Sequence, residues 1–221
     1  MMSQVAFYLS IFKPYLCVIM AYLLGSIPTS YLIGRIFFQT DIRQSGSGNT
    51  GATNALRTFG TKTGIIVLII DMLKGVAAIL LTALILKFEP DMFKVQLFVS
   101  LSGLFVIVGH VYSMFLHFKG GKGVATAGGV FLAILPIQLL FCLVLFVVIV
   151  AVTKYVSLGS MLAATAFLLT EVFSQFIVDF PNVPQLVLVI LIVSLILIRH
   201  KSNLQRLMNG NENKLSFKKK I

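Results

Sequence analysis

Long apolar runs separated by short polar segments form the main pattern of this sequence. A helix needs about 20 predominantly apolar residues to cross a bilayer, and several runs reach or approach that length. A kink is expected at Pro28, because proline lacks a backbone donor and frees a carbonyl of the preceding turn. Residues 1–12 are weakly amphipathic and are expected at the membrane interface. The pattern predicts membrane helices over residues 15–38, 64–86, 96–116, 158–178 and 184–198.

The apolar stretch over residues 124–153 fits either one long helix or two helices divided at Pro136. One long helix would place Lys154 on the opposite side of the membrane from Lys122. A turn at Pro136 returns Lys154 to the side of Lys122, but it leaves residues 124–135 about 18 Å long against about 30 Å of hydrocarbon. Those residues then form either a short helix sheltered by protein or a re-entrant helix.

The distribution of Lys and Arg favours the turn at Pro136. With that turn the chain has seven hydrophobic helices, with fourteen Lys and Arg residues on one side of the membrane and three on the other. This asymmetry predicts an N-terminus outside and a cytoplasmic C-terminus. Without the turn, the basic tail over residues 199–221 would lie on the opposite side from the first two polar segments described below.

The composition supports an all-α polytopic integral membrane protein with one membrane-embedded domain over residues 1–221. The chain is 58% hydrophobic and only 11% charged, whereas an ordinary soluble domain has about 25% charged residues. Its mean hydropathy is +0.99. The net charge of +11 indicates cytoplasmic loops and contact with anionic membrane lipids, not nucleic acid. We expect the first apolar run to be retained as a helix, and Cys17 and Cys142 to be small hydrophobic residues within helices.

A polar segment over residues 43–57 interrupts the apolar pattern after the first helix. Gly46, Gly48 and Gly51 allow the backbone to approach a ligand closely, and successive N–H groups in such a loop can cradle an anion. The surrounding hydroxyl, amide and guanidinium groups, among them Asn54 and Arg57, suit a phosphate or a polyol. The alternative is a flexible loop with turn-forming glycines, although a linker does not need so many polar side chains.

Three further polar segments are candidates for the same site. Residues 117–123 (HFKGGKG) lack the Walker spacing and a preceding strand, yet glycine N–H groups and a lysine at a helix start can bind phosphate. The alternative there is a pair of snorkelling lysines. Ser157 or Ser160 could simply cap a helix. His200 and Asn203 share one face of a basic membrane-proximal helix, and such a helix is itself the default interpretation.

Three ionisable residues within the apolar runs, Asp71, Lys74 and His110, are also candidates for a functional site. The spacing of Asp71 and Lys74 favours a structural ion pair. No His-x4-Asp pair occurs, so the base-and-carboxylate pair of the common soluble-type acyltransferases is missing. The acidic residues and histidines are scattered, and we therefore expect no metal site and no cofactor. No strand precedes Gly46-Ser47-Gly48, which argues against a nucleophile elbow.

The polar segments, in this order, resemble the bacterial membrane acyl-phosphate:glycerol-3-phosphate acyltransferase family (PlsY). The resemblance covers most of residues 22–214 and rests mainly on residues 45–54 (SGSGNTGATN) and 118–126 (FKGGKGVAT), which together are highly specific. Two departures from the family pattern are Ser113, where proline is expected, and Lys154, where arginine is usual. Shorter matches lie at residues 25–28, 71–75 and 155–158 and at His200, Asn203, Gly210 and Glu212.

The resemblance implies transfer of a fatty acyl group from acyl phosphate to the 1-hydroxyl of glycerol-3-phosphate, which gives lysophosphatidic acid and phosphate. It implies catalytic roles for Ser47, Arg57, Lys122 and His200, with Arg57 and Lys122 on phosphate. Either His200 or a substrate phosphate would take the hydroxyl proton. The loop at residues 45–57 would hold glycerol-3-phosphate, and the second glycine segment would form another phosphate cradle. The implied substrate-binding residues are Ser45, Gly46, Gly48, Asn49, Gly51, Thr53, Asn54, Gly120, Gly121, Gly123, Ser157 and Asn203.

The resemblance also implies seven helices in the bacterial inner membrane, with the active site at the cytoplasmic face. Functional coupling to the enzyme that produces acyl phosphate is a further expectation. A transporter of an anionic metabolite is an alternative, although the polar segments gather at one face and no inverted repeat is obvious. An acyltransferase that uses acyl-CoA or acyl carrier protein is another alternative, because the basic tail could dock a carrier protein.

Overall fold

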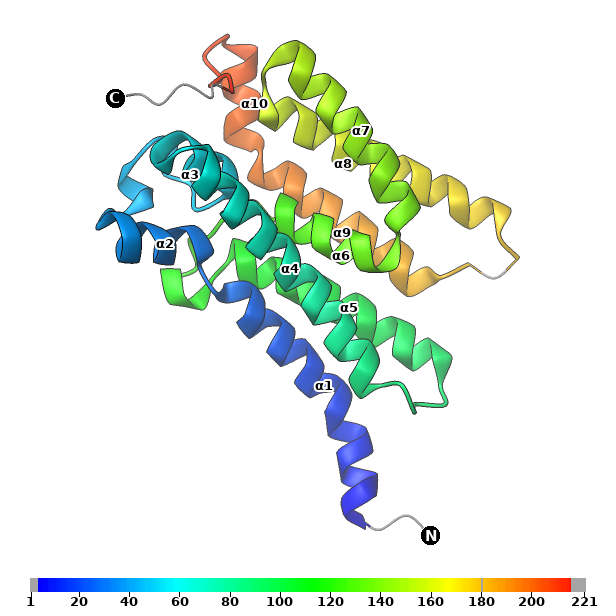
Figure 1. The fold of residues 1–221 in the computed structure, drawn as a ribbon. Helices are drawn as coiled ribbons and strands as arrows, with labels where there is room; N and C mark the ends of the chain where they lie inside the picture. The colour runs from blue at the N-terminus through cyan, green and yellow to red at the C-terminus, as the bar shows by residue number, and fades with distance from the viewer. Residues whose placement is uncertain (1–3, 180, 216–221) are drawn as a thin grey trace.

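The structure is a computed structural model that describes residues 4–179 and 181–215. Over these residues the chain forms helices and no strands (Figure 1). The lysine run at residues 218–220 lies outside the described residues. The helices are α1 Gln4–Ser26, α2 Thr29–Phe38, η1 Ile42–Gln44, α3 Ala52–Phe59, α4 Thr61–Ile85, α5 Met92–Val111, η2 Met114–Leu116, α6 Val124–Ile134, α7 Pro136–Thr153, α8 Val156–Ile177, α9 Val183–Arg199 and α10 Lys201–Met208.

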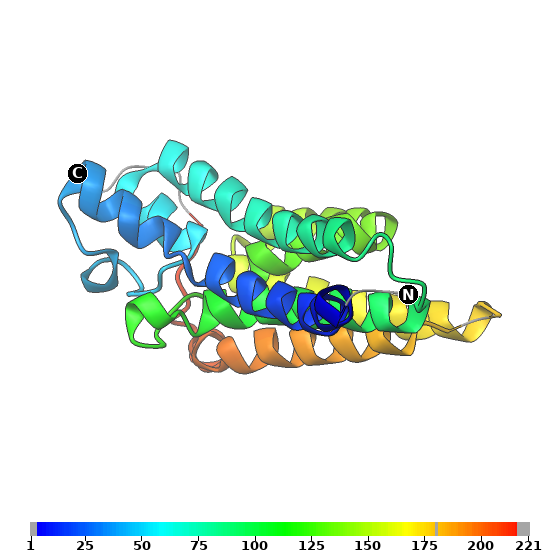
Figure 2. The same ribbon diagram turned by 90° about the horizontal axis from the view of Figure 1, so that it is seen from below.

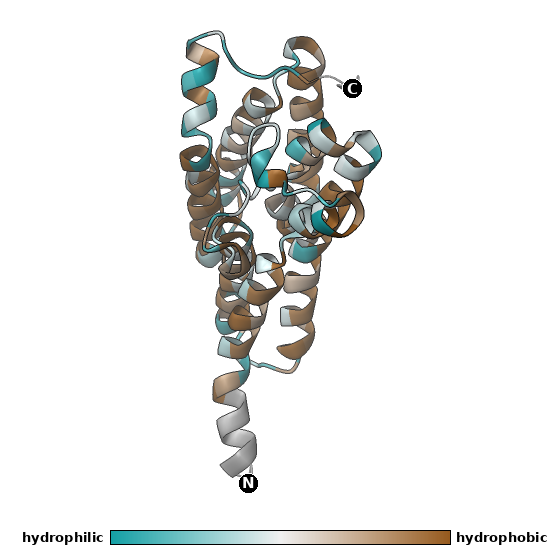
Figure 3. Cartoon of the chain, turned by 90° about the vertical axis from the view of Figure 1, so that its left-hand side faces the viewer, coloured by the Kyte–Doolittle hydropathy of each residue, from teal (hydrophilic) through white to brown (hydrophobic). Residues whose placement is uncertain are grey.

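The long helices pack side by side into one bundle. α1 packs on α5 and α4, α5 packs on α9, and α8 packs on both α7 and α9. Figure 2 shows α4 along one side of the bundle and α9 along the other, with α5 between them. Most hydrophilic segments gather at the end away from the N-terminus, whereas the helix surfaces are largely hydrophobic (Figure 3). On α7 the buried residues are Cys142 and Val150, so most of this apolar helix faces the surroundings, as expected for a helix in lipid.

Five segments are long and apolar enough to cross a membrane, and a sixth is added if α9 and α10, which are bent by 51° to each other, count as one span. The prediction of an all-helical, multi-pass membrane protein is confirmed. α6 has 11 residues, or about 16 Å of helix, and is too short to cross the hydrocarbon alone. The chain reverses between α6 and α7 at Leu135 and Pro136, where the sequence predicts a turn.

The predicted kink at Pro28 is a complete break between α1 and α2. Two carbonyl groups next to Pro28 lack helical partners and are satisfied by side chains of other helices and loops. The Ser113 hydroxyl donates to the Ser26 carbonyl, and the Lys74 ammonium donates to the Ile27 carbonyl. Lys74 also pairs with Asp71 at 2.7 Å, and both side chains are buried. The Asp71–Lys74 pair therefore anchors the break, which explains why two charges can be buried there.

Several predicted boundaries are wrong. Residues 4–12, expected as an interfacial segment, belong to α1, which continues through Pro14. The connection between the helices predicted at 64–86 and 96–116 is shorter than the nine residues left between them, because Asp91 accepts a hydrogen bond from the Lys94 N–H at 3.1 Å and caps α5. The polar segment over residues 43–57 includes most of α3, where no helix was predicted. The basic membrane-proximal helix predicted around His200 and Asn203 is present as α10. These two helices have eight residues each, a length at which packing decides helix formation more than local propensity does.

Glycines bring α4 and α6 into close contact. A Cβ atom added at Gly75 would overlap the Thr126 carbonyl oxygen, and one added at Gly129 would overlap the Met72 carbonyl oxygen. Small residues at such crossings allow helix backbones to approach closely within a membrane. This contact holds the short helix α6 against the bundle.

We expect Gly129→Ala to destabilise the protein by about 1–3 kcal/mol, because the added methyl group forces α4 and α6 apart. Gly128→Ala is the matched control, since the nearest atom to its added Cβ would be Met72 Cε at 3.9 Å, an ordinary contact. Thermal unfolding of both variants in detergent measures the difference. Equal unfolding midpoints would contradict the tight contact at Gly129.

Candidate active site

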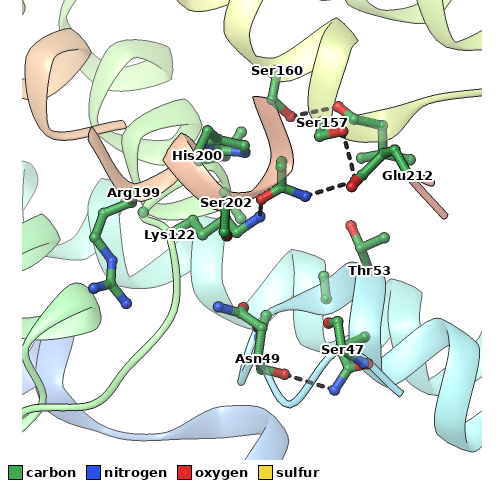
Figure 4. Close-up of a pocket in the computed structure, with 18 of the residues that line it drawn as sticks. Ser47, Asn49, Thr53, Lys122, Ser157, Ser160, Arg199, His200, Ser202 and Glu212 are labelled. Atoms are coloured by element: carbon green, nitrogen blue, oxygen red, sulfur yellow. Dashed lines mark hydrogen bonds between the residues drawn. The ribbon is translucent and has the colours of Figure 1, made fainter. Parts of the chain in front are cut away.

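The polar segments meet around one cavity of about 510 Å³. It lies at the polar end of the bundle, between the first turns of α3, α6, α8 and α10 (Figure 4). Four sequence segments far apart in the chain therefore contribute to one site. The sequence-predicted residues that line it are Ser47, Asn49, Gly51, Thr53, Asn54, Arg57, Lys122, Gly123, Ser157, His200 and Asn203.

The N-termini of α3, α6 and α8 all begin at this cavity. Their first residues, Ala52, Val124 and Val156, line it, and none of the three helices has a side-chain cap. The first N–H groups of a helix have no partner within the helix, and the helix dipole favours negative charge there by about 0.3–1 kcal/mol per terminus. Together, the three termini form an environment suited to phosphate.

The buried side chain of Asn54 holds the glycine loop through hydrogen bonds to its backbone. Its side chain is 2% exposed, and its Oδ1 accepts a hydrogen bond from the Ser47 N–H at 2.8 Å. Its Nδ2 lies 2.9–3.2 Å from the carbonyl oxygens of Ile42, Ser45 and Asn49. A Cβ at Gly46, whose φ is +60°, would overlap Asn54 Oδ1, so this glycine is required for the loop to close over the amide. Asn54 therefore positions the loop.

A polar network ties three of the helices together on the other side of the cavity. Lys122 donates to Asn203 Oδ1, and Asn203 Nδ2 donates to Glu212 Oε1 at 2.7 Å. The same carboxylate oxygen accepts from the Ser157 hydroxyl at 2.8 Å, and Glu212 Oε2 accepts from Arg206 Nε at 2.7 Å. Neither Ser157 nor Ser160 caps α8: Ser160 donates to the Val156 carbonyl. Glu212 is thus the centre of the network, and it orients both Ser157 and Asn203, the partner of Lys122.

Positive charge in the cavity is only partly balanced. Among the described residues, Arg206 pairs with Glu212, but Arg57, Lys122 and Arg199 have no carboxylate within ion-pair distance. Arg57 Nη2 donates to the Asn213 carbonyl at 3.1 Å, while the buried Nε atoms of Arg57 and Arg199 have no hydrogen-bond partner. Buried donors without partners are costly, and a bound anion would satisfy them.

Burial also changes the proton affinity of these groups. It lowers the pKa of Lys122 to about 8, with neighbouring arginines adding to the effect and Glu212 opposing it. Burial lowers the pKa of Arg57 as well. For Glu212, burial alone would raise the pKa, but hydrogen bonds from Asn203, Ser157 and Arg206 outweigh burial and lower it. The network carboxylate is therefore ionised, and Lys122 is the cation most easily discharged.

His200 lies in the bend between α9 and α10 and is 3% exposed. Its Nδ1 is 2.8 Å from the Ile196 carbonyl oxygen. A carbonyl oxygen can only accept, so Nδ1 carries the proton and Nε2 of the neutral ring is free to accept one. Burial and the neighbouring charge of Lys122 lower the pKa of His200 to about 4, so the ring is neutral and Nε2 can accept a hydrogen bond or, as a weak base, a proton in the cavity that it lines.

Five predicted binding residues do not line the cavity: Ser45, Gly46, Gly48, Gly120 and Gly121. The N–H groups of Gly120 and Gly121 donate to the carbonyls of Val111 and His110, at 2.9 and 3.0 Å, and so are not free to cradle phosphate. Added Cβ atoms there would overlap His110. These two glycines instead allow the chain to pass close to α5 and bring Lys122 and Gly123 to the cavity.

The cavity contains residues that sequence reasoning did not place in the site. Arg199, Arg206 and Glu212 line it. Asp71 and His110, which are functional-site candidates because they lie within the apolar runs, line it as well. Glu212 belongs to a matching segment in the sequence, but only the fold shows that it contacts Ser157 and Asn203. Among the described residues no group of three His, Cys, Asp or Glu side chains could hold a metal ion. Arg43, at the other end of the glycine loop from Arg57, pairs with Asp41 at 2.6 Å and lies outside the cavity.

Comparison with known proteins finds relatives that share one name. The chain is 47% identical over 195 residues to the glycerol-3-phosphate acyltransferase of Trichlorobacter lovleyi, covering 88% of this chain and 93% of the relative. It is 44% identical over 202 residues to the enzyme of the same name from Geobacillus kaustophilus, covering 91% and 96%.

Two solved structures have the same fold. Both are crystal structures of PlsY, an integral membrane glycerol 3-phosphate acyltransferase. The glycerol 3-phosphate form superimposes with a TM-score of 0.82 at 37% identity, and the lysophosphatidic acid form with a TM-score of 0.78 at 36% identity. Each comparison covers 92% of this chain and 96% of the other. Since the glycerol-3-phosphate acyltransferase family model also matches residues 15–210, the chain belongs to this family.

Proposed function

We propose that this protein transfers a fatty acyl group from acyl phosphate to the 1-hydroxyl of glycerol-3-phosphate. The hydroxyl oxygen attacks the acyl carbonyl carbon, the bond from that carbon to the phosphate oxygen breaks, and lysophosphatidic acid and phosphate are released. The observation that carries the proposal is the cavity itself, where three uncapped helix N-termini and several cations face one another. Two anionic substrates repel each other, and fixed donors and cations offset that repulsion.

The arrangement suggests how the roles are divided. Arg57 and the N-terminus of α3 are on the same side as the glycine loop and would bind glycerol-3-phosphate. Lys122, with the N-termini of α6 and α8, would bind the phosphate of the donor. Either His200 Nε2 or a substrate phosphate would accept the hydroxyl proton. Phosphate is a good leaving group, so the reaction needs no covalent acyl-enzyme, and positioning supplies much of the rate enhancement.

The chain would act as a single membrane-embedded domain over residues 1–221, in a bacterial inner membrane. Its proposed topology has seven membrane-embedded helices, with α6 sheltered by its neighbours, the N-terminus outside and the cavity at the cytoplasmic face. The excess of Lys and Arg in the segments on the cavity side of the membrane supports this orientation. Acyl phosphate would be supplied by the enzyme that produces it.

The first test is formation of lysophosphatidic acid by the purified protein in lipid. Radiolabelled glycerol-3-phosphate is offered with palmitoyl phosphate, palmitoyl-CoA or palmitoyl carrier protein in turn. Product with palmitoyl phosphate alone is the expected result. Product with a thioester donor would overturn the donor assignment, and glycerol-3-phosphate uptake into vesicles without acylation would favour a transporter.

Replacing a cavity cation should remove most of the activity. Arg57→Ala and Lys122→Ala are each expected to lower kcat/KM by about 10²–10³-fold, because each removes a positioned charge from a developing or bound phosphate. Arg43→Ala is the matched control from the same loop, since Arg43 pairs with Asp41 outside the cavity. Normal turnover by the Arg57 or Lys122 variant would refute the phosphate assignment.

The pH dependence should report on Lys122. In the free protein its pKa is about 8, so the charge is present below that pH and is lost above it. We expect kcat/KM for palmitoyl phosphate to fall as the pH rises through about 8, and kcat to fall only at higher pH, because the bound donor phosphate stabilises the ammonium. Lys122→Arg keeps its charge over this range, so its residual activity should lack the alkaline limb.

Glu212→Gln tests the network rather than the phosphate contacts. A neutral amide weakens the hydrogen bonds from Ser157, Asn203 and Arg206, and we expect a loss of about 1.5–3 kcal/mol in transition-state stabilisation, or roughly 10- to 150-fold in kcat/KM. Glu89→Gln is the control, because Glu89 pairs with Lys94 at 2.8 Å near the start of α5. Equal activities of the two variants would show that the network does not position the site.

A further inference from the structure

One face of α6 leads away from the cavity. At helical spacing, Val124, Ala125, Gly128 and Leu132 lie on the same side of this helix. The first two line the cavity, and Leu132 is 47% exposed. The opposite side, which includes Gly129, is buried against the bundle. An apolar surface therefore runs from the polar site along the outside of α6.

Two other helices border this surface. Leu68 of α4 and Phe146 of α7 are apolar residues that line the same cavity. α4 packs on α3, α5 and α6, and α7 packs on α8 and α6, so α6 is the element that both share. α6 thus lies between α4 and α7, and its first residues, Val124 and Ala125, line the cavity.

Gly128 differs from the other glycines of the long helices and α6. A Cβ atom at Gly25, Gly75, Gly109 or Gly129 would overlap backbone atoms, whereas at Gly128 the nearest atom would be Met72 Cε at 3.9 Å. Gly128 has no positive φ either. Neither packing nor backbone conformation requires a glycine here, although glycine within a helix costs about 1 kcal/mol relative to alanine. Because glycine has no side chain, the surface of α6 at Gly128 is left open.

We propose that Gly128 is a specificity-determining residue, and that the space above it lets a long acyl chain lie along α6 between α4 and α7. This inference rests on the proposed function, because it takes the acyl chain of the substrate as the occupant. The occupant is favoured because the surface is apolar and begins where the acyl carbonyl must lie. Gly128 is five residues past Gly123, or about 8 Å along the helix, so only chains that extend beyond that point depend on it.

The test is a chain-length comparison in Gly128→Leu and in the smaller variant Gly128→Ala. In Gly128→Leu we expect kcat/KM with palmitoyl phosphate to fall at least tenfold, kcat/KM with hexanoyl phosphate to change less than threefold, and the KM for glycerol-3-phosphate to be retained. Gly128→Ala, which adds a methyl group without overlap, should show a smaller loss with the same dependence on chain length. Ala83→Leu also introduces a leucine, at an exposed position near the far end of α4, and controls for a general effect on the helix surface.

A binding measurement separates this inference from the identity of the donor. The Kd values of palmitoyl and hexanoyl lysophosphatidic acid do not depend on which donor the enzyme uses. A selective loss of palmitoyl binding in Gly128→Leu supports the inference even if acyl phosphate proves to be the wrong donor. Equal losses for both chain lengths, or no loss for either, would overturn it.

Discussion

The close contact between α4 and α6 is the interaction on which the site depends. α6 is too short to cross the hydrocarbon, so its polar ends must be sheltered by protein. Gly75 and Gly129 let the two backbones approach until side chains on either helix would collide. That contact fixes the depth of the α6 N-terminus, and with it the positions of Lys122 and Gly123 at the edge of the cavity. A regular helix of full length would place these groups away from the other polar segments.

The cavity combines strong attraction for anions with a limited cost of burying cations. Its cations are Arg57, Lys122 and Arg199, and the nearby carboxylate of Glu212 is already occupied by Arg206 and by two neutral donors. The carboxylate therefore orients Asn203 without neutralising the cations that face the cavity. Burial of the Lys122 ammonium is the main cost of this arrangement, and it lowers the pKa of that group. A bound phosphate offsets that cost by pairing with the buried cations. Part of the affinity for phosphate therefore comes from charges that are poorly solvated in the empty site.

The sequence predicted the multi-pass helical fold, the turn at Pro136 and most of the residues that line the cavity. The helices follow from length and hydropathy, the turn from the distribution of Lys and Arg along the chain, and the cavity residues from local polar motifs and the family resemblance that they carry. The prediction that the N–H groups of Gly120 and Gly121 cradle phosphate is wrong. These N–H groups donate to carbonyls of α5, which only the folded chain brings near. Glu212 matches the family pattern, but its place at the centre of the network follows only from the fold, which brings Ser157 and Asn203 to it. The helix α3 was missed because eight residues between glycines give too short a pattern.

The position of the cavity at the end of the bundle can be understood from the two substrates of the proposed reaction. Burying one methylene group contributes about 0.8 kcal/mol, so moving a long acyl chain into water would cost many kcal/mol. Glycerol-3-phosphate, in contrast, carries a charge that hydrocarbon excludes. A site that accepts both must open to water and to lipid at the same depth. The short helix α6 meets both demands: its N-terminus faces the polar cavity, and its outer face, with Gly128 at its centre, continues toward the hydrocarbon.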